Sequence, residues 1–221
     1  MVRGLANREQ MTPQFSEGCG AIYSAHRDAV SGSWVDFPIP RDVGVGRIRS
    51  LGASGPIAAC EHRMSFSRSV SFSDEAPSRS VSVGFCVGAE VEWTTSCSTT
   101  RQVTKSVDTG SLFIQSGGRG SYSICYLQDL EYEFVSLYVP LDMAGRHSAN
   151  GDVKVALDGA DGFEAPMTPA MRASLASLRH NAFVGCAGRL YAEGKILELL
   201  ASVVALLDTG RRRENHGIPR S

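Results

Sequence analysis

The residue types that bind metals are scattered along this chain. Its five histidines, far apart in sequence, are His26, His62, His147, His180 and His216. Two histidines can share a metal ion when they lie two apart on a strand, because such positions face the same side. The chain has no HxH, HxxxH or DxH spacing, so we expect no metal site. His62 falls in a run typical of a strand and is either a structural histidine or a ligand-binding one.

Motifs for covalent and redox catalysis are also absent. The six cysteines form no CxxC pair, and neither a GxSxG sequence nor a dinucleotide-binding fingerprint occurs. Glu131 and Glu133 alternate along a predicted strand, as is common on a face exposed to solvent. The sequence therefore predicts a protein that is not an enzyme and has no cofactor. A metal-free small-molecule enzyme such as an isomerase, with His62 or Glu61 in its site, is the alternative.

Aromatic side chains on predicted strands are the candidates for lining a ligand site, because a small β-barrel can hold one ligand in its mouth. The candidate ligand-binding residues are His62, Phe85, Trp93, Phe113 and Tyr122. The same aromatic residues would also serve to fill a closed core. In that case the protein would be a structural scaffold.

Composition excludes several classes of protein. The formal net charge is −1, which gives no electrostatic footprint for nucleic acid or an anionic membrane. The longest apolar run, from Ile196 to Leu207, is interrupted by Glu198 and is shorter than the ~18–20 residues of a membrane span. The N-terminus has no apolar signal region. We therefore expect a cytoplasmic protein with reduced thiols and no membrane partner.

The elements that would position these residues are mostly strands. Residues 1–42 show no sustained period, so we expect an irregular N-terminal arm there. Val81, Val83 and Phe85 alternate with small residues, which predicts a strand with one buried face. Many short strands without intervening helices favour a sandwich or barrel over residues 43–140. Strands are expected at 45–50, 57–66, 81–87, 91–95, 100–106, 111–114, 120–127 and 132–139.

A helical period begins near residue 141. We expect a short helix at 141–147 and a loop up to Pro166. Thr168 and Pro169 predict the start of a helix, with Thr168 as N-cap and Pro169 at the first helical position. Apolar residues then occur at helical spacing on one face of this helix.

The last helix is expected from about Ala187 to Asp208, with two adjacent apolar stripes. A helix that packs only on its own domain needs one stripe, so the second indicates either a dimer interface or deep burial within the monomer. The stripe assigned to the dimer interface is Leu190, Leu197, Leu200, Val204 and Leu207; the other is Ile196, Leu199, Val203 and Leu206. Residues 209–221 are expected to form a disordered basic tail.

Four segments, in order, resemble the N-terminal regulatory half of AraC/XylS-family transcription regulators, particularly the PchR-like branch. VDTGSLF at 107–113 is similar to a family turn and strand, although Thr109 stands where proline is usual. FVSLYV at 134–139 resembles the strand that closes the cupin barrel, and PMTPAM at 166–171 resembles the start of the first interface helix. LYAEGK at 190–195 with ELLA at 198–201 resembles the branch's LYxEGKxxELLA helix.

The resemblance implies a mainly β fold: a cupin-like barrel (a double-stranded β-helix) that senses a small-molecule effector, followed by helices at 141–208 for packing and dimerisation. It implies a siderophore or another metabolite as effector, and a homodimer or a heterodimer with related regulators. It also implies a C-terminal pair of helix-turn-helix motifs, which this sequence lacks. We therefore expect no sequence-specific DNA binding by this chain alone, whether it is truncated or acts by pairing with full-length regulators. A metal-free enzyme of cupin type stays the alternative.

Overall fold

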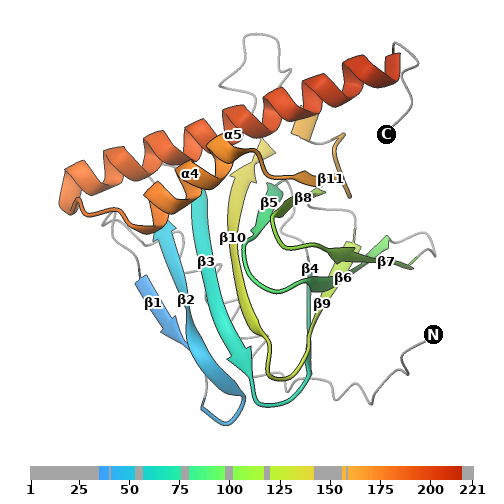
Figure 1. Cartoon of the computed structure of the whole chain (residues 1–221), viewed down its shortest axis with the longest axis vertical. Helices are drawn as coiled ribbons and strands as arrows, with labels where there is room; N and C mark the ends of the chain where they lie inside the picture. The colour runs from blue at the N-terminus through green and yellow to red at the C-terminus, as the bar shows by residue number, and fades with distance from the viewer. Residues whose placement is uncertain are drawn as a thin grey trace.

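The structure is a computed structural model. The part of the chain that it describes comprises residues 35–39, 41–52, 57–75, 80–97, 102–116, 120–141, 156–157 and 159–215. Within these ranges the chain forms two antiparallel sheets and two C-terminal helices (Figure 1). The predicted mainly β fold with C-terminal helices is confirmed.

The larger sheet has seven strands in the order β1-β2-β3-β10-β5-β8-β11. Its strands are β1 (Val35–Pro38), β2 (Gly44–Gly52), β3 (Ala58–Phe66), β5 (Ser80–Cys86), β8 (Ser111–Ser116), β10 (Glu131–Pro140) and β11 (Glu164–Pro166). The smaller sheet has four strands in the order β4-β9-β6-β7. They are β4 (Val70–Glu75), β6 (Val91–Cys97), β7 (Gln102–Val107) and β9 (Gly120–Tyr126).

Each of the eight expected strands overlaps an observed one, whereas β1, β4 and β11 were not foreseen. β1 lies within the segment expected to be an irregular arm, and residues 1–34 lie outside the described part. Each of these strands pairs with one neighbour: β1 with β2, β4 with β9 and β11 with β8. β1 and β11 have only four and three residues, too few to show a period. In β4, Val70 and Phe72 alternate with serines, a strand signal that the prediction overlooked.

The seven-stranded sheet is buried on both faces. Its inner face packs against the four-stranded sheet and forms the inner core, which includes Phe66 and Tyr132. Its outer face packs against the helices and forms the outer core, which includes Leu112 and Leu137. Strand β10 shows the partition, since Tyr132 and Phe134 belong to the inner core while Val135 and Leu137 belong to the outer core.

Helix α4 (Pro169–Arg179) begins where the sequence predicts. The Thr168 Oγ1 accepts a hydrogen bond from the Met171 backbone N–H at 3.2 Å, which confirms Thr168 as the N-cap. Met171, Leu175 and Leu178 are buried in the outer core. Of the short helix expected at 141–147, only Leu141 falls within the described residues.

Helix α5 (Gly185–Asn215) lies beside α4 across the seven-stranded sheet (Figure 1). It continues over residues 209–215, where a disordered tail was expected. This stretch contains no proline to break the helix. Neither α4 nor α5 is long and apolar enough to cross a membrane.

Candidate functional site

A small cavity lies where β6, β7 and β8 meet the segment that leads into α4. Its volume is about 40 Å³, which holds little more than a water molecule or two. We call it the aromatic cavity. Its lining includes Trp93, Lys105, Phe113, Gln115, Phe163 and Glu164.

The aromatic wall of this cavity is fixed by a glycine. Phe113 on β8 pairs with Gly84 on β5, and a Cβ atom at Gly84 would lie 2.2 Å from the Phe113 ring. The Phe113 ring can occupy this position only because Gly84 has no side chain. Trp93 also packs on Phe113, with 5.0 Å between the two ring centroids and an interplanar angle of 53°.

The polar groups around the cavity come from β7, β8 and the covering segment. The Lys105 Nζ donates a hydrogen bond to the Gly162 carbonyl at 2.6 Å. The Gly162 N–H donates to the Ile114 carbonyl, and the Ile114 N–H donates to the Phe163 carbonyl, both at 2.9 Å. Gln115 is buried beside them. An aromatic pair beside an ammonium and an amide is a lining suited to a small ligand with an apolar body and a polar group.

Of the predicted ligand-binding residues, the structure brings Trp93 and Phe113 together. His62 faces the inner core, where its ring stacks on Phe134 with 4.0 Å between centroids, and it is not part of the cavity lining. Phe85 is fully buried in the outer core, on the opposite face of β5 from Gly84. Tyr122 lies on β9 opposite Thr95 of β6, and its side chain is outside the described part.

Lys105 and Phe163 are lining residues that the sequence did not indicate. Lys105 lies two positions before Val107, which is buried in the inner core, so the two share a face of β7. The two-residue spacing from Val107 is the sequence feature that could have placed Lys105 on the cavity side of β7. Phe163 precedes the short strand β11, and no periodic pattern surrounds it.

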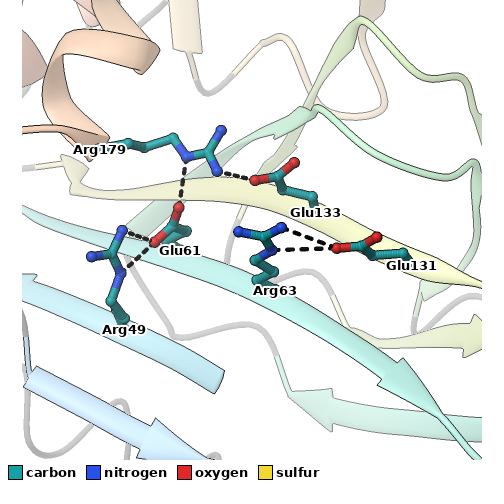
Figure 2. Close-up of polar contacts among 6 residues, drawn as sticks. All are labelled: Arg49, Glu61, Arg63, Glu131, Glu133 and Arg179. Atoms are coloured by element: carbon teal, nitrogen blue, oxygen red, sulfur yellow. Dashed lines mark hydrogen bonds and ion pairs between the residues drawn. The ribbon is translucent and has the colours of Figure 1, made fainter. Parts of the chain in front are cut away.

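A buried group of charged residues lies on the outer face of the large sheet (Figure 2). This charged cluster consists of Arg49, Glu61, Glu133 and Arg179. Glu61 is 2% exposed and forms an ion pair with Arg49. The Arg179 Nε donates to the Glu61 Oε1 at 2.6 Å, and its Nη2 pairs with Glu133.

The charged cluster ties the end of α4 to the barrel, because Arg179 is the last residue of that helix and bridges β3 and β10. It also bears on the enzyme alternative. The Glu61 carboxylate is engaged by two arginines outside the barrel, whereas the neighbouring His62 faces inward. The two residues named for that alternative therefore do not face one common site.

The predicted dimer stripe of α5 is divided between surface and core. Leu190 is 70% exposed and Leu197 is 36% exposed. Leu200 and Val204 are partly exposed, and Leu207 is buried in the outer core of the monomer. The buried face of α5 is made of Ala192, Ile196, Leu199, Val203 and Leu207. The outward face thus keeps two exposed leucines.

Metal ligands and reactive thiols do not gather at the cavity. Among the described residues no group of three His, Cys, Asp or Glu side chains could hold a metal ion. Burial, with the Asp108 carboxylate as the next cause, raises the pKa of the Cys86 thiol to about 11. Cys86 is therefore a protonated core residue at neutral pH.

Comparisons with known proteins fit this architecture. Residues 47–218 match the family described as the regulatory protein PchR N-terminal domain. No curated protein matches the chain. The AraC-like transcriptional activator CuxR has a similar solved structure, with a TM-score of 0.51 and 12% identity, covering 86% of this chain and 65% of that chain.

Two further solved structures are similar over smaller parts. Oxalate decarboxylase of Bacillus subtilis has a TM-score of 0.37 and 14% identity, covering 60% of this chain and 40% of that one. The 7S globulin of Momordica charantia has the same TM-score and identity, covering 49% and 32%. The chain thus spans less than two thirds of the length of these structures. The mainly β fold with C-terminal helices that the sequence predicts is shared with CuxR.

Proposed function

The chain belongs to the family of PchR N-terminal regulatory domains, and from this premise we propose that it senses a small-molecule effector in the aromatic cavity and pairs with a second chain through α5. It is the regulatory part of an AraC-like regulator. We place this activity in the cytoplasm, where such a regulator would meet both a metabolite and its partner chain.

The aromatic cavity carries the proposal for effector binding. Trp93 and Phe113 offer two aromatic faces, and the ammonium of Lys105 and the amide of Gln115 are polar groups that can fix a ligand's orientation. A volume of about 40 Å³ is too small for a metabolite, so binding requires the cavity to widen. A siderophore or another small metabolite fits the role of effector.

A titration experiment tests effector binding. Siderophores, with and without iron, and a panel of small metabolites are titrated into the chain by calorimetry. For any binder found, Trp93→Leu and Phe113→Leu should each weaken binding by about tenfold or more, because each removes one stacking face. Phe183→Leu is the matched control, since Phe183 is 56% exposed and outside the cavity.

Two results would contradict this assignment. A binder whose affinity is the same in the Trp93 and Phe113 variants occupies another site. The absence of any binder across the panel favours the structural scaffold instead.

The outward face of α5 carries the proposal for pairing. Leu190 and Leu197 are seven residues apart, so they lie on one side of the helix and present an apolar surface to solvent. The opposite side of α5 already fills the outer core. The partner is a second copy of this chain or a related regulator with the same helix.

The alternative, a metal-free cupin-type enzyme, has less support in the geometry, because Glu61 and His62 face opposite sides of β3. Turnover of a metabolite that is abolished by both Glu61→Gln and His62→Gln would favour it over the sensor.

A further inference from the structure

We propose that residues 159–166, the strap, form a gate over the aromatic cavity that Lys105 holds shut, and that opening of the strap loosens the start of α4. The proposal rests on the effector site proposed above and names how that site would be regulated. Three observations carry it: how the strap is attached, how little of it is buried, and the helix into which it leads.

The strap is attached to the barrel along one side. Its strand β11 pairs with β8 over three residues, Glu164 to Pro166 opposite Phe113 to Ser111. Two backbone hydrogen bonds to Ile114 extend this pairing to Gly162 and Phe163. Ala160 is buried in the outer core and Phe163 packs against that core. The Lys105 Nζ adds a side-chain contact, a 2.6 Å hydrogen bond to the Gly162 carbonyl. Lys105 comes from β7 in the other sheet, so this bond joins the strap to the far side of the cavity.

Most of the strap is exposed, including Asp161, Gly162 and Glu164. Its buried apolar side chains are few: Ala160 lies in the outer core, and Phe163 is partly buried against it. Gly162 has a φ of +72°, which a glycine adopts without strain and which turns the chain over the cavity. A segment with few apolar contacts and exposed hydrogen bonds opens locally at low cost. The strap is therefore the element that would move when a ligand larger than the present cavity enters.

The strap continues directly into α4. Met167 comes next in the chain, is buried in the outer core and donates a backbone hydrogen bond to Gly110 at 2.8 Å. Thr168 then caps the helix and also accepts from the Arg172 N–H at 3.1 Å. Displacement of the strap acts on this capped first turn before it acts on any other helical residue.

The opposite end of α4 is held by the charged cluster (Figure 2). One end of the helix is thus fixed to β3 and β10, while the other end is joined to the strap. Helix α4 contacts α5 through the outer core and through the hydrogen bond from Ser174 to Glu198. Motion at the strap end would therefore reach α5, which carries the proposed pairing surface.

Amide hydrogen exchange on the ligand-free chain tests the gate. Lys105→Met keeps the length of the side chain and removes its ammonium, so the amides of Gly162 and Met167 should exchange roughly fivefold faster. The amides of Met171 and Arg172 in the first turn of α4 should accelerate with them, while those of β10 stay slow. Lys105→Arg, which keeps a donor, should restore slow exchange. Arg172→Met, an exposed charge removal on α4, is the control and should leave the strap unchanged.

Each other outcome overturns part of the proposal. Unchanged exchange at Gly162 and Met167 would show that Lys105 does not hold the strap shut. Faster exchange in the strap with an unchanged first turn of α4 would show that the two are not coupled. Because no effector is present, these results are independent of whether a ligand is ever found.

A second measurement uses Trp93 as a probe of the open cavity. The chain has two tryptophans, so a Trp34→Phe background leaves Trp93 as the single tryptophan. In that background Lys105→Met should increase quenching of Trp93 by acrylamide. Equal quenching with and without Lys105 would contradict a gate at this position.

Discussion

At the residue scale, Glu61 shows how one buried charge can orient a helix. Its side chain is 3% exposed and accepts hydrogen bonds from both Arg49 and Arg179. A buried ion pair gains little net stability over an apolar pair, because both charges lose their hydration. Its geometric demand is strict, however, since each carboxylate oxygen needs a donor. The charged cluster therefore fixes where α4 ends on the barrel more than it stabilises the fold.

Loss of Arg179 tests this role. Arg179→Met leaves Glu61 with Arg49 alone and leaves Glu133 without this partner, so the free energy of unfolding should fall by about 1–3 kcal/mol. Arg63→Met is the matched control, because Arg63 pairs with Glu131 with side chains 55% and 68% exposed and should cost no more than about 1 kcal/mol. Urea unfolding of both variants measures the difference. Equal losses would show that burial of the cluster is unimportant.

Gly84 shapes the aromatic cavity because it has no side chain. A methyl group there would overlap the Phe113 ring, so Gly84→Ala should displace the ring from Trp93 and lower the free energy of unfolding by about 1–3 kcal/mol. Gly194→Ala is the control: its Cβ meets nothing within 4 Å, and the helix should gain up to about 1 kcal/mol. Urea unfolding followed by tryptophan fluorescence measures both. An unchanged Gly84→Ala variant would contradict the assigned packing.

At the element scale, the sequence predicts what depends on local pattern. The cap at Thr168 and Pro169 is local chemistry, and α4 begins where those residues indicate. The alternation along β5 likewise marks a strand. β1 and β11 are too short for local periodicity to show them, whereas the alternation of Val70 and Phe72 with serines in β4 was a local signal that the prediction did not use. The extension of α5 beyond Asp208 has a different cause, since polar residues without proline are compatible with both helix and coil.

The candidate site could be predicted only in part, for a related reason. Phe85 and Phe113 are both aromatic residues on central strands, yet Phe85 faces the outer core and Phe113 the cavity. Alternation tells which residues share a face, but both faces of this sheet are buried, so it does not tell which face is the inner one. The covering strap adds residues from a turn, where no period exists. Trp93 and Phe113 could be predicted from the sequence as ligand-binding residues. That they line one cavity together with Lys105 and Phe163 is visible only in the folded chain.

Helix α5 illustrates the same ambiguity with a functional consequence. Two apolar stripes were visible in its sequence, and the structure buries Ile196, Leu199 and Val203 in the outer core. Leu207, expected at the dimer interface, is buried with them because the outer core extends along the helix to that point. Leu190 and Leu197 are left on the outward face. The pairing surface proposed for this helix is therefore centred nearer its beginning.

At the scale of the whole molecule, the two helices pack on the barrel through the outer core, and α4 is also tied to it at each end. The strap connects α4 to the edge of β8, and the charged cluster connects the other end of α4 to β3 and β10 (Figures 1 and 2). In a regulatory domain this arrangement would let a ligand in the barrel act on a helix that faces a partner. Coupling of this kind has a regulatory effect only if the outward face of α5 binds a second chain.

Sedimentation velocity at micromolar concentration tests most directly whether the outward face of α5 binds a second chain. The chain should sediment as a dimer, and Leu190→Asp with Leu197→Asp should convert it to a folded monomer, because two carboxylates would be buried at the interface. Leu127→Asp, at a leucine 54% exposed in the turn between β9 and β10, should leave the dimer intact. A chain that sediments as a monomer at every concentration, or a dimer that survives both substitutions on α5, would contradict the account.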